Sequence, residues 1–73
     1  MGKKPSYNRV WLLSAREEKG YTQAQVANAA GIEPATYCYI EQGKREPLVK
    51  TAIAITDFLG VSIRNFITEK PIV

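Results

Sequence analysis

The sequence lacks histidine, and it contains one cysteine, Cys38, and one aspartate, Asp57, among its 73 residues. Metal centres and disulfides need clusters of cysteine or histidine, so these counts exclude most of them. No nucleophile stands at a suitable spacing from a base, and no glycine-rich loop of the phosphate-binding kind occurs. The sequence therefore predicts a protein that is not an enzyme and carries no metal, cofactor or evident small-molecule ligand.

Long hydrophobic runs are also absent. No stretch approaches the roughly 20 apolar residues that cross a membrane, and the N-terminus lacks the apolar core of a secretion signal. We therefore expect a cytoplasmic protein without a membrane partner.

A chain of 73 residues that is 45% hydrophobic and 23% charged predicts one globular domain with a small core, in which any buried polar group matters for stability.

The charge of the chain is modest and positive. A net charge of +3 and a pI near 9.2 favour an anionic partner. Residues 1–6 are predicted to form a flexible basic arm, to which Arg9 adds charge; this arm either touches a phosphate backbone or is a solvated terminus. The folded domain is predicted over 7–68, and 69–73 are predicted to form a C-terminal tail.

Two short helices joined by a glycine turn form the central motif. The capping box Thr22-x-x-Gln begins the first helix, and Gly31 supplies the left-handed residue that ends it. Pro34 suits the first position of the next helix and keeps the residue before it extended. The predicted helices are 23–30 and 34–42, which together form a helix-turn-helix unit. An ordinary corner between two helices of a small helical domain would give the same signals.

Three further helices are predicted around this unit. The first should run from about Tyr7 to Lys19 with Ser6 as its cap, the fourth over 48–59, and a short last helix after Ser62. The residues expected to face the core are Asn8, Trp11, Leu12 and Ala15 in the first helix, Val26, Ala27 and Ala30 in helix 23–30, and Val49, Ala52, Ile53, Thr56 and Leu59 in the fourth.

Helix 34–42 has two different sides. At 100° per residue, Tyr37 and Ile40 point inward and Glu41 lies beside them. An inward stripe of two residues is narrow, so the opposite side is free for a partner. The outward residues are Ala35, Cys38, Tyr39 and Gln42, with Thr36 on the border.

A longer set of residues then matches a known family at the family's spacing. These residues are Arg16 to Gln23, Val26-Ala27, Gly31-Ile32, Ile40 to Arg45, Pro47 and Leu59 to Ser62. Through them the chain resembles, over about 8–67, the Cro/phage-repressor type of helix-turn-helix domain, also called the XRE family. The resemblance implies an all-α, compact five-helix bundle of the lambda-repressor-like type. Helix 23–30 would cross the DNA backbone, and helix 34–42 would be the recognition helix in the major groove.

The resemblance also implies an ion pair and a set of DNA contacts. Family members commonly pair an arginine late in the first helix with a glutamate late in the recognition helix, here Arg16 and Glu41. Both lie at the edge of an apolar face, so we interpret the pair as structural rather than as a DNA contact. The residues expected at double-stranded DNA are Thr22, Gln23, Glu33, Pro34, Ala35, Thr36, Tyr39, Gln42, Lys44 and Arg45. For Gln23 the alternative is a polar residue facing water, and for the last three it is a solvated loop.

The recognition helix departs from the family pattern at the positions that read bases. Two-point contacts to guanine need arginine or lysine, and those to adenine need asparagine or glutamine, yet none of these precedes Gln42 on the outward side. Ala35 suits a thymine methyl, Thr36 a short hydrogen bond, and Tyr39 a base, phosphate or sugar. Glu33 is repelled by phosphates unless it accepts from a cytosine amino group. We therefore expect specificity to depend on shape, methyl contacts and water.

The predicted function is that of a sequence-specific DNA-binding transcriptional regulator, most simply a repressor that forms a homodimer on a near-palindromic operator with half-sites about 34 Å apart. Its origin as a phage or mobile-element repressor, an antitoxin or a restriction-modification controller stays open. The competing function is a protein-interaction module, or antitoxin-type partner, with weak or no specific DNA binding. The expected dimer interface is Phe66, Ile67, Ile72 and Val73, for which packing on the chain's own core is the alternative.

Overall fold

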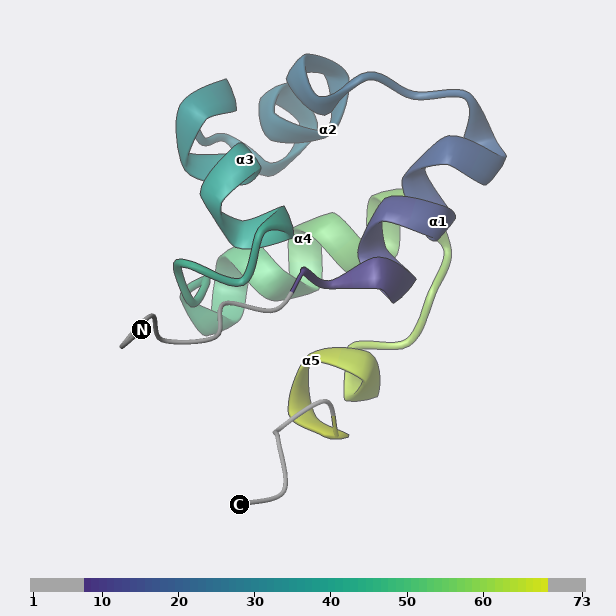
Figure 1. Ribbon diagram of the computed structural model, residues 1–73, viewed down its shortest axis with the longest axis vertical. Coiled ribbons are helices and arrows are strands. Elements are labelled where there is room, and N and C mark those ends of the chain that lie inside the picture. Colours follow the sequence, from purple (N-terminus) through teal and green to yellow (C-terminus); the bar gives the residue numbers. More distant parts are fainter. Residues whose placement is uncertain (1–7, 69–73) are drawn as a thin grey trace, which may run out of the picture.

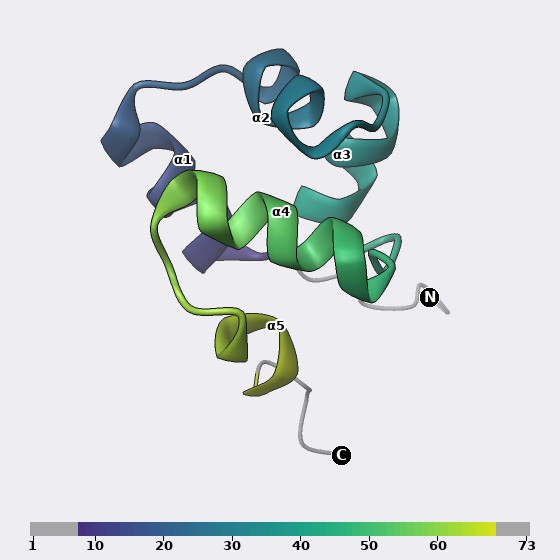
Figure 2. The same ribbon diagram turned by 180° about the vertical axis from the view of Figure 1, so that it is seen from behind.

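The computed structural model describes residues 8–68, which form five helices and no strand (Figures 1 and 2). The helices are α1 (Val10–Lys19), α2 (Gln23–Ala30), α3 (Pro34–Glu41), α4 (Val49–Leu59) and α5 (Arg64–Thr68). The predicted all-α, five-helix fold is therefore confirmed. None of these helices is long and apolar enough to cross a membrane. The predicted arm 1–6, with its candidate cap Ser6, and the predicted tail 69–73 lie outside the described residues.

The helices are arranged around α4. Helix α2 packs against both α3 and α4, and α1 contacts the same two helices. In both views α5 lies on the opposite side of α4 from α2 (Figures 1 and 2). Helix α3 lies at one edge of the bundle, with other helices on one side of it only (Figures 1 and 2).

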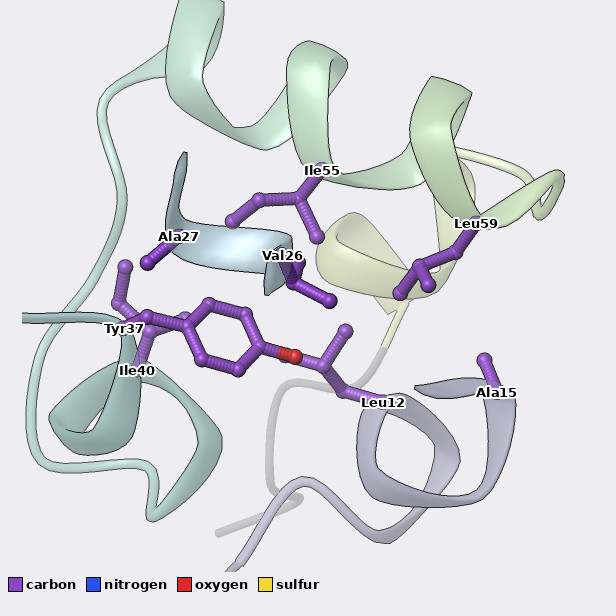
Figure 3. Close-up of a cluster of buried hydrophobic side chains, with 8 residues drawn as sticks. All are labelled: Leu12, Ala15, Val26, Ala27, Tyr37, Ile40, Ile55 and Leu59. Carbon is purple, nitrogen blue, oxygen red and sulfur yellow. The ribbon is translucent and has the colours of Figure 1, made fainter. Parts of the chain in front are cut away.

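The core is built around the ring of Tyr37 (Figure 3). This side chain is fully buried, and it lies among Leu12 of α1, Val26 of α2 and Ile55 of α4. Ala15, Ala27, Ile40 and Leu59 complete the buried cluster, against which the half-buried Trp11, Tyr21, Ala30 and Phe66 pack. The inward sides predicted for helices 23–30 and 34–42 are therefore confirmed.

Helix α1 begins later than predicted, at Val10 rather than at Tyr7. Arg9 has φ −82° and ψ 84°, which are not helical angles, and its backbone N–H donates to the carbonyl oxygen of Glu41 at 2.8 Å. Arg9 is thus held by the end of α3, and neither Asn8 nor Arg9 continues the helix. Asn8, which was expected to face the core, is exposed for the same reason.

The inner face of α4 is rotated relative to the prediction. Ile55 is fully buried, whereas Val49 and Ile53 are 75% and 45% exposed. The other predicted inward residues of α4 are buried, namely Ala52, Thr56 and Leu59. Both the observed and the predicted sets follow helical spacing and are largely apolar. Periodicity alone therefore could not distinguish the face that packs against α2 from its neighbour.

The unit of α2, the turn and α3 contains the local signals that the sequence predicts. The hydroxyl of Thr22 accepts from the Gln25 backbone N–H at 3.1 Å, and the Gln25 side chain accepts from the Thr22 N–H at 2.8 Å. Gly31 has φ 73°, a left-handed conformation that costs glycine little. Pro34 is the first residue of α3. The capping box thus fixes the start of α2, and Gly31 and Pro34 fix the turn that separates the two helices.

A single buried carboxylate joins α1, α2 and α3. Glu41 is 6% exposed, and the Nε of Arg16 lies 2.6 Å from its Oε2 while Nη2 donates to Oε1 at 3.2 Å. The Nε2 of Gln23 donates to Oε1 at 2.8 Å, and the hydroxyl of Tyr37 donates to Oε2 at 2.9 Å. The predicted pair of Arg16 and Glu41 is thus present, with a two-point geometry inside the bundle.

The ionisation of this network depends on its hydrogen bonds. Burial raises the pKa of the Glu41 carboxyl, but hydrogen bonds from Arg16, Gln23 and Tyr37 outweigh burial, and the net pKa is lowered. The hydrogen bond to Glu41 raises the pKa of Arg16, and burial raises that of Tyr37. A carboxyl with a lowered pKa stabilises the fold above its unfolded pKa of about 4.3. That stability is lost as the pH falls through the folded pKa.

Glu41→Gln is expected to lower the free energy of unfolding at pH 7 by about 3 kcal/mol, because it leaves the Arg16 charge without its buried partner. Protonation of Glu41 removes the same charge, so the difference between wild type and variant should shrink below about pH 4. Urea unfolding at neutral and acidic pH measures both effects. Glu18→Gln, at an exposed position of α1, is the control and should change the free energy by less than about 0.5 kcal/mol. A difference that is equal at both pH values would contradict the stabilising role of the ion pair.

Candidate nucleic-acid interface

The outward side of α3 is uncovered. Its inward residues Tyr37 and Ile40 are 0% and 1% exposed, whereas Tyr39 is 49% exposed and Ala35 is also exposed. Both ribbon views place α3 at the edge of the bundle, with no helix on its outer side (Figures 1 and 2). Within residues 8–68, this side of the helix is therefore open to a partner, as the sequence predicts.

The first half of α3 presents a chemically mixed surface. Glu33 precedes the helix in an extended conformation and is exposed, as are Pro34 and Ala35. Thr36 is half-buried and borders a small hollow that the loop after α3 and the start of α4 also line. The surface thus offers a carboxylate, apolar groups and one hydroxyl. No residue of α3 is an arginine or a lysine.

At the start of α2, the side chains expected at DNA are already engaged within the protein. Thr22 is exposed, but its hydroxyl caps the helix. Gln23 is half-buried, and its amide nitrogen is bound to Glu41. A phosphate contact from Gln23 therefore stays a prediction, and it would have to use the second N–H of this nitrogen or the backbone N–H at the start of α2.

At the end of α3, Gln42 and Cys38 are similarly paired. Both are half-buried, and the Nε2 of Gln42 donates to the Sγ of Cys38 at 3.2 Å. This contact joins two residues one helical turn apart on the outward side. It holds the long amide side chain of Gln42 against the helix, and its predicted DNA contact stays a prediction.

The loop after α3 places two cations beside the open side of the helix. Lys44 and Arg45 are both exposed. The backbone N–H of Lys44 donates to the carbonyl oxygen of Tyr39 at 2.9 Å, and that of Gly43 donates to Ile40 at 3.1 Å. The backbone of the loop is thus held against the last turn of α3 while its charged side chains extend into solvent. This combination suits contacts with phosphate groups.

Arg9 does not belong to a basic arm, contrary to the prediction. It is 1% exposed, and its side chain contacts backbone carbonyls at the end of α3 and in the following loop. One signal in the sequence could have revealed this burial: Arg9 lies one turn before Leu12, on the line of the inner face of α1. Because the side chain is positively charged, we predicted that it would be exposed to solvent instead.

Of the residues expected at a dimer interface, two are described. Phe66 is half-buried and packs edge-to-face on Trp11, with ring centroids 4.8 Å apart. Ile67, its neighbour, is 64% exposed. Ile72 and Val73 lie outside the described residues. Phe66 thus contributes to the chain's own core, and Ile67 remains open on the surface of α5.

Comparison with known proteins agrees with this geometry. The helix-turn-helix family model matches residues 12–66. The uncharacterized HTH-type transcriptional regulator YqaF of Bacillus subtilis (strain 168) is 48% identical over 52 residues, which are 71% of this chain and 68% of that protein. The SPbeta prophage-derived uncharacterized HTH-type transcriptional regulator YonR of the same organism is 41% identical over 51 residues. That match covers 70% of this chain but less than half, 47%, of YonR.

Among solved structures, the N-terminal DNA binding domain of SinR from Bacillus subtilis is similar, with a TM-score of 0.73 and 25% identity. The match covers 85% of this chain and 91% of that domain. The family match spans all five helices apart from the ends of α1 and α5. The chain therefore belongs to the XRE-type helix-turn-helix family of DNA-binding transcriptional regulators.

Proposed function

We propose that the protein is a dimeric repressor that binds a near-palindromic operator and places helix 34–42 in the major groove of each half-site. The observation that supports this function best is the uncovered outward side of α3, with a basic loop directly after it. A groove about 12 Å wide admits one helix. A chain bound across an operator would exclude other proteins from it, and we place this activity in the cytoplasm.

The contacts with DNA divide into two groups. Lys44 and Arg45 supply charge to the phosphate backbone, with Gln42, Thr22 and Gln23 as further backbone contacts. These contacts carry affinity and position the protein on the duplex without reading sequence. Base edges meet the first half of α3, namely Glu33, Pro34, Ala35 and Thr36, and also Tyr39.

A dimer is supported by apolar side chains that the single chain leaves in solvent. Val49 of α4 is 75% exposed and Ile67 of α5 is 64% exposed. Both line one groove between these helices, together with the half-buried Phe66. Single exposed apolar residues are ordinary, but a group of them along one groove is typical of an interaction surface. We therefore place the second copy on the α4–α5 face.

Salt dependence tests DNA binding. On a duplex selected from a random pool, the affinity should fall steeply between about 50 and 200 mM salt, because counterions are released from the phosphates. The double variant Lys44→Ala/Arg45→Ala should reduce the slope of log affinity against log salt by roughly 2 per protomer. Lys19→Ala, which removes an exposed cation at the far end of α1, should leave the slope nearly unchanged. Absence of any DNA affinity at low salt would favour the protein-interaction module instead.

Methyl recognition tests the base-reading surface. Replacement of a contacted thymine by uracil should weaken binding by about fourfold, the effect of roughly 0.8 kcal/mol for one methyl group. Ala35→Gly should bind the two duplexes equally, because it removes the side chain that meets the methyl group. A full base-substitution scan by fluorescence anisotropy measures these effects. Two or more direct guanine contacts from α3 would contradict the proposed mode of recognition.

Charge reversal of an apolar surface tests the dimer. Val49→Lys should weaken self-association by about tenfold or more, because it places two like charges in a desolvated interface. The fold should persist, since Val49 is 75% exposed in the single chain. Sedimentation equilibrium measures the association, with Ala29→Lys at an exposed position of α2 as the matched control. Equal association of Val49→Lys and wild type would exclude this face.

A further inference from the structure

The guanidinium of Arg9 is buried at the end of α3. Its side chain is fully shielded from solvent, and Nη2 lies 2.9 Å from the Oε2 of Glu46. Nη1 donates to the carbonyl oxygen of Ile40 and, at 3.1 Å, to that of Arg45. The backbone N–H of Arg9 donates to the carbonyl oxygen of Glu41 at 2.8 Å. All these acceptors belong to the last turn of α3 or to the loop that follows it.

The chemistry of arginine explains this position. The last carbonyls of a helix lack partners within the helix, and the negative end of the helix dipole attracts a cation. A planar guanidinium can donate in several fixed directions at once, which an ammonium on a flexible stem does not do. The ring of Phe66 covers the group, with its centroid 5.3 Å from Cζ. Arg9 thus connects three segments: the end of α3, the loop after it, and α5.

The carbonyl contacts matter more than the ion pair. The side chain of Glu46 is 74% exposed, and ion pairs with an exposed partner contribute little. The contact with the Ile40 carbonyl is buried and that with the Arg45 carbonyl is partly buried, so their loss would remove hydrogen bonds that water replaces poorly. The loop between α3 and α4 has no helix of its own. Its shape therefore depends on such contacts.

We propose that Arg9 is a positioning residue for DNA binding, which holds the loop after α3 so that Lys44 and Arg45 meet the phosphate backbone. The proposal rests on the proposed DNA-binding function. Arg9 itself is 1% exposed and does not reach DNA. It acts through the backbone of Arg45, which it holds directly, and through the end of α3, to which the N–H of Lys44 is bonded.

The test compares Arg9→Met, which keeps an unbranched stem but removes every donor, with Arg64→Met. Arg64 is exposed on α5, so this control loses the same charge without touching the loop. Both are measured on the duplex selected with the wild type, at a temperature where unfolding curves show each protein folded. Arg9→Met should reduce affinity about tenfold and the salt slope by roughly 1 to 2 per protomer, as lost phosphate contacts require. Arg64→Met should keep the wild-type slope.

A double-mutant cycle distinguishes positioning from general destabilisation. In the Lys44→Ala/Arg45→Ala background, Arg9→Met should cost less than about twofold in affinity, because the groups through which it acts are gone. Equal fold-losses in both backgrounds would overturn the proposal. A purely structural Arg9 would lower the melting temperature and leave the slope of the folded protein unchanged, which would overturn it as well.

The outcomes also separate this proposal from the function on which it rests. If Arg9→Met does not fold, Arg9→Gln replaces it: the glutamine amide nitrogen ends two bonds short of Nη1, so it cannot reach both carbonyls, the slope should still fall, and an unchanged slope would overturn the proposal. A wild type without DNA affinity would overturn the proposed function and the positioning role together. A wild type that binds, with a slope that depends on Lys44 and Arg45 but not on Arg9, would overturn only the positioning role.

Discussion

The direction in which α3 points depends on the buried carboxylate of Glu41. Donors reach this group from α1 through Arg16, from α2 through Gln23, and from α3 itself through Tyr37. A charge that is only 6% exposed destabilises a fold unless its partners are in place. A change in the relative position of any of the three helices would therefore cost the buried carboxylate at least one of its donors. In a small domain with few large core side chains, this constraint has a large weight.

The two arginines of the first segment act on the same end of α3. Arg16 binds the Glu41 side chain, whereas Arg9 binds backbone carbonyls of the last turn and of the loop beyond it. One contact orients the helix and the other orients the chain that leaves it. In the sequence the two arginines lie before and after Leu12, whose side chain is fully buried. The core and both polar contacts therefore act jointly to hold α3 in place. Helix α1 and the residue before it thus support α3 from the inner side of the bundle, away from the open side of α3.

Local signals and long-range contacts differ in how well the sequence reveals them. Three local signals were predicted: the capping box at Thr22, the turn at Gly31 and the start of α3 at Pro34. Each of them involves only residues within four positions of one another in the chain. The position of Arg9 one turn before Leu12 hints at its burial, but its acceptors are carbonyls more than 30 residues away in the chain, and no local pattern identifies them. The prediction of the inner face of α4 was wrong for a related reason. Ile53 and Ile55 are equally apolar, and only the position of α2 decides which of them is buried.

In the candidate site, too, local features were predicted from the sequence and side-chain contacts were not. Exposure of the outward side of α3 followed from its narrow apolar stripe, but the engagement of Gln23 with Glu41 and of Gln42 with Cys38 did not. Each of these amide nitrogens has one N–H committed within the protein. In the proposed complex, the attraction to DNA therefore comes mainly from the loop after α3, and discrimination comes from the first half of the helix. These regions lie about 12 Å apart, the length of a two-turn helix. In the proposed complex, the firmly anchored end of α3 is therefore the end that binds phosphates. The opposite end, which reads bases, takes its direction from that anchor.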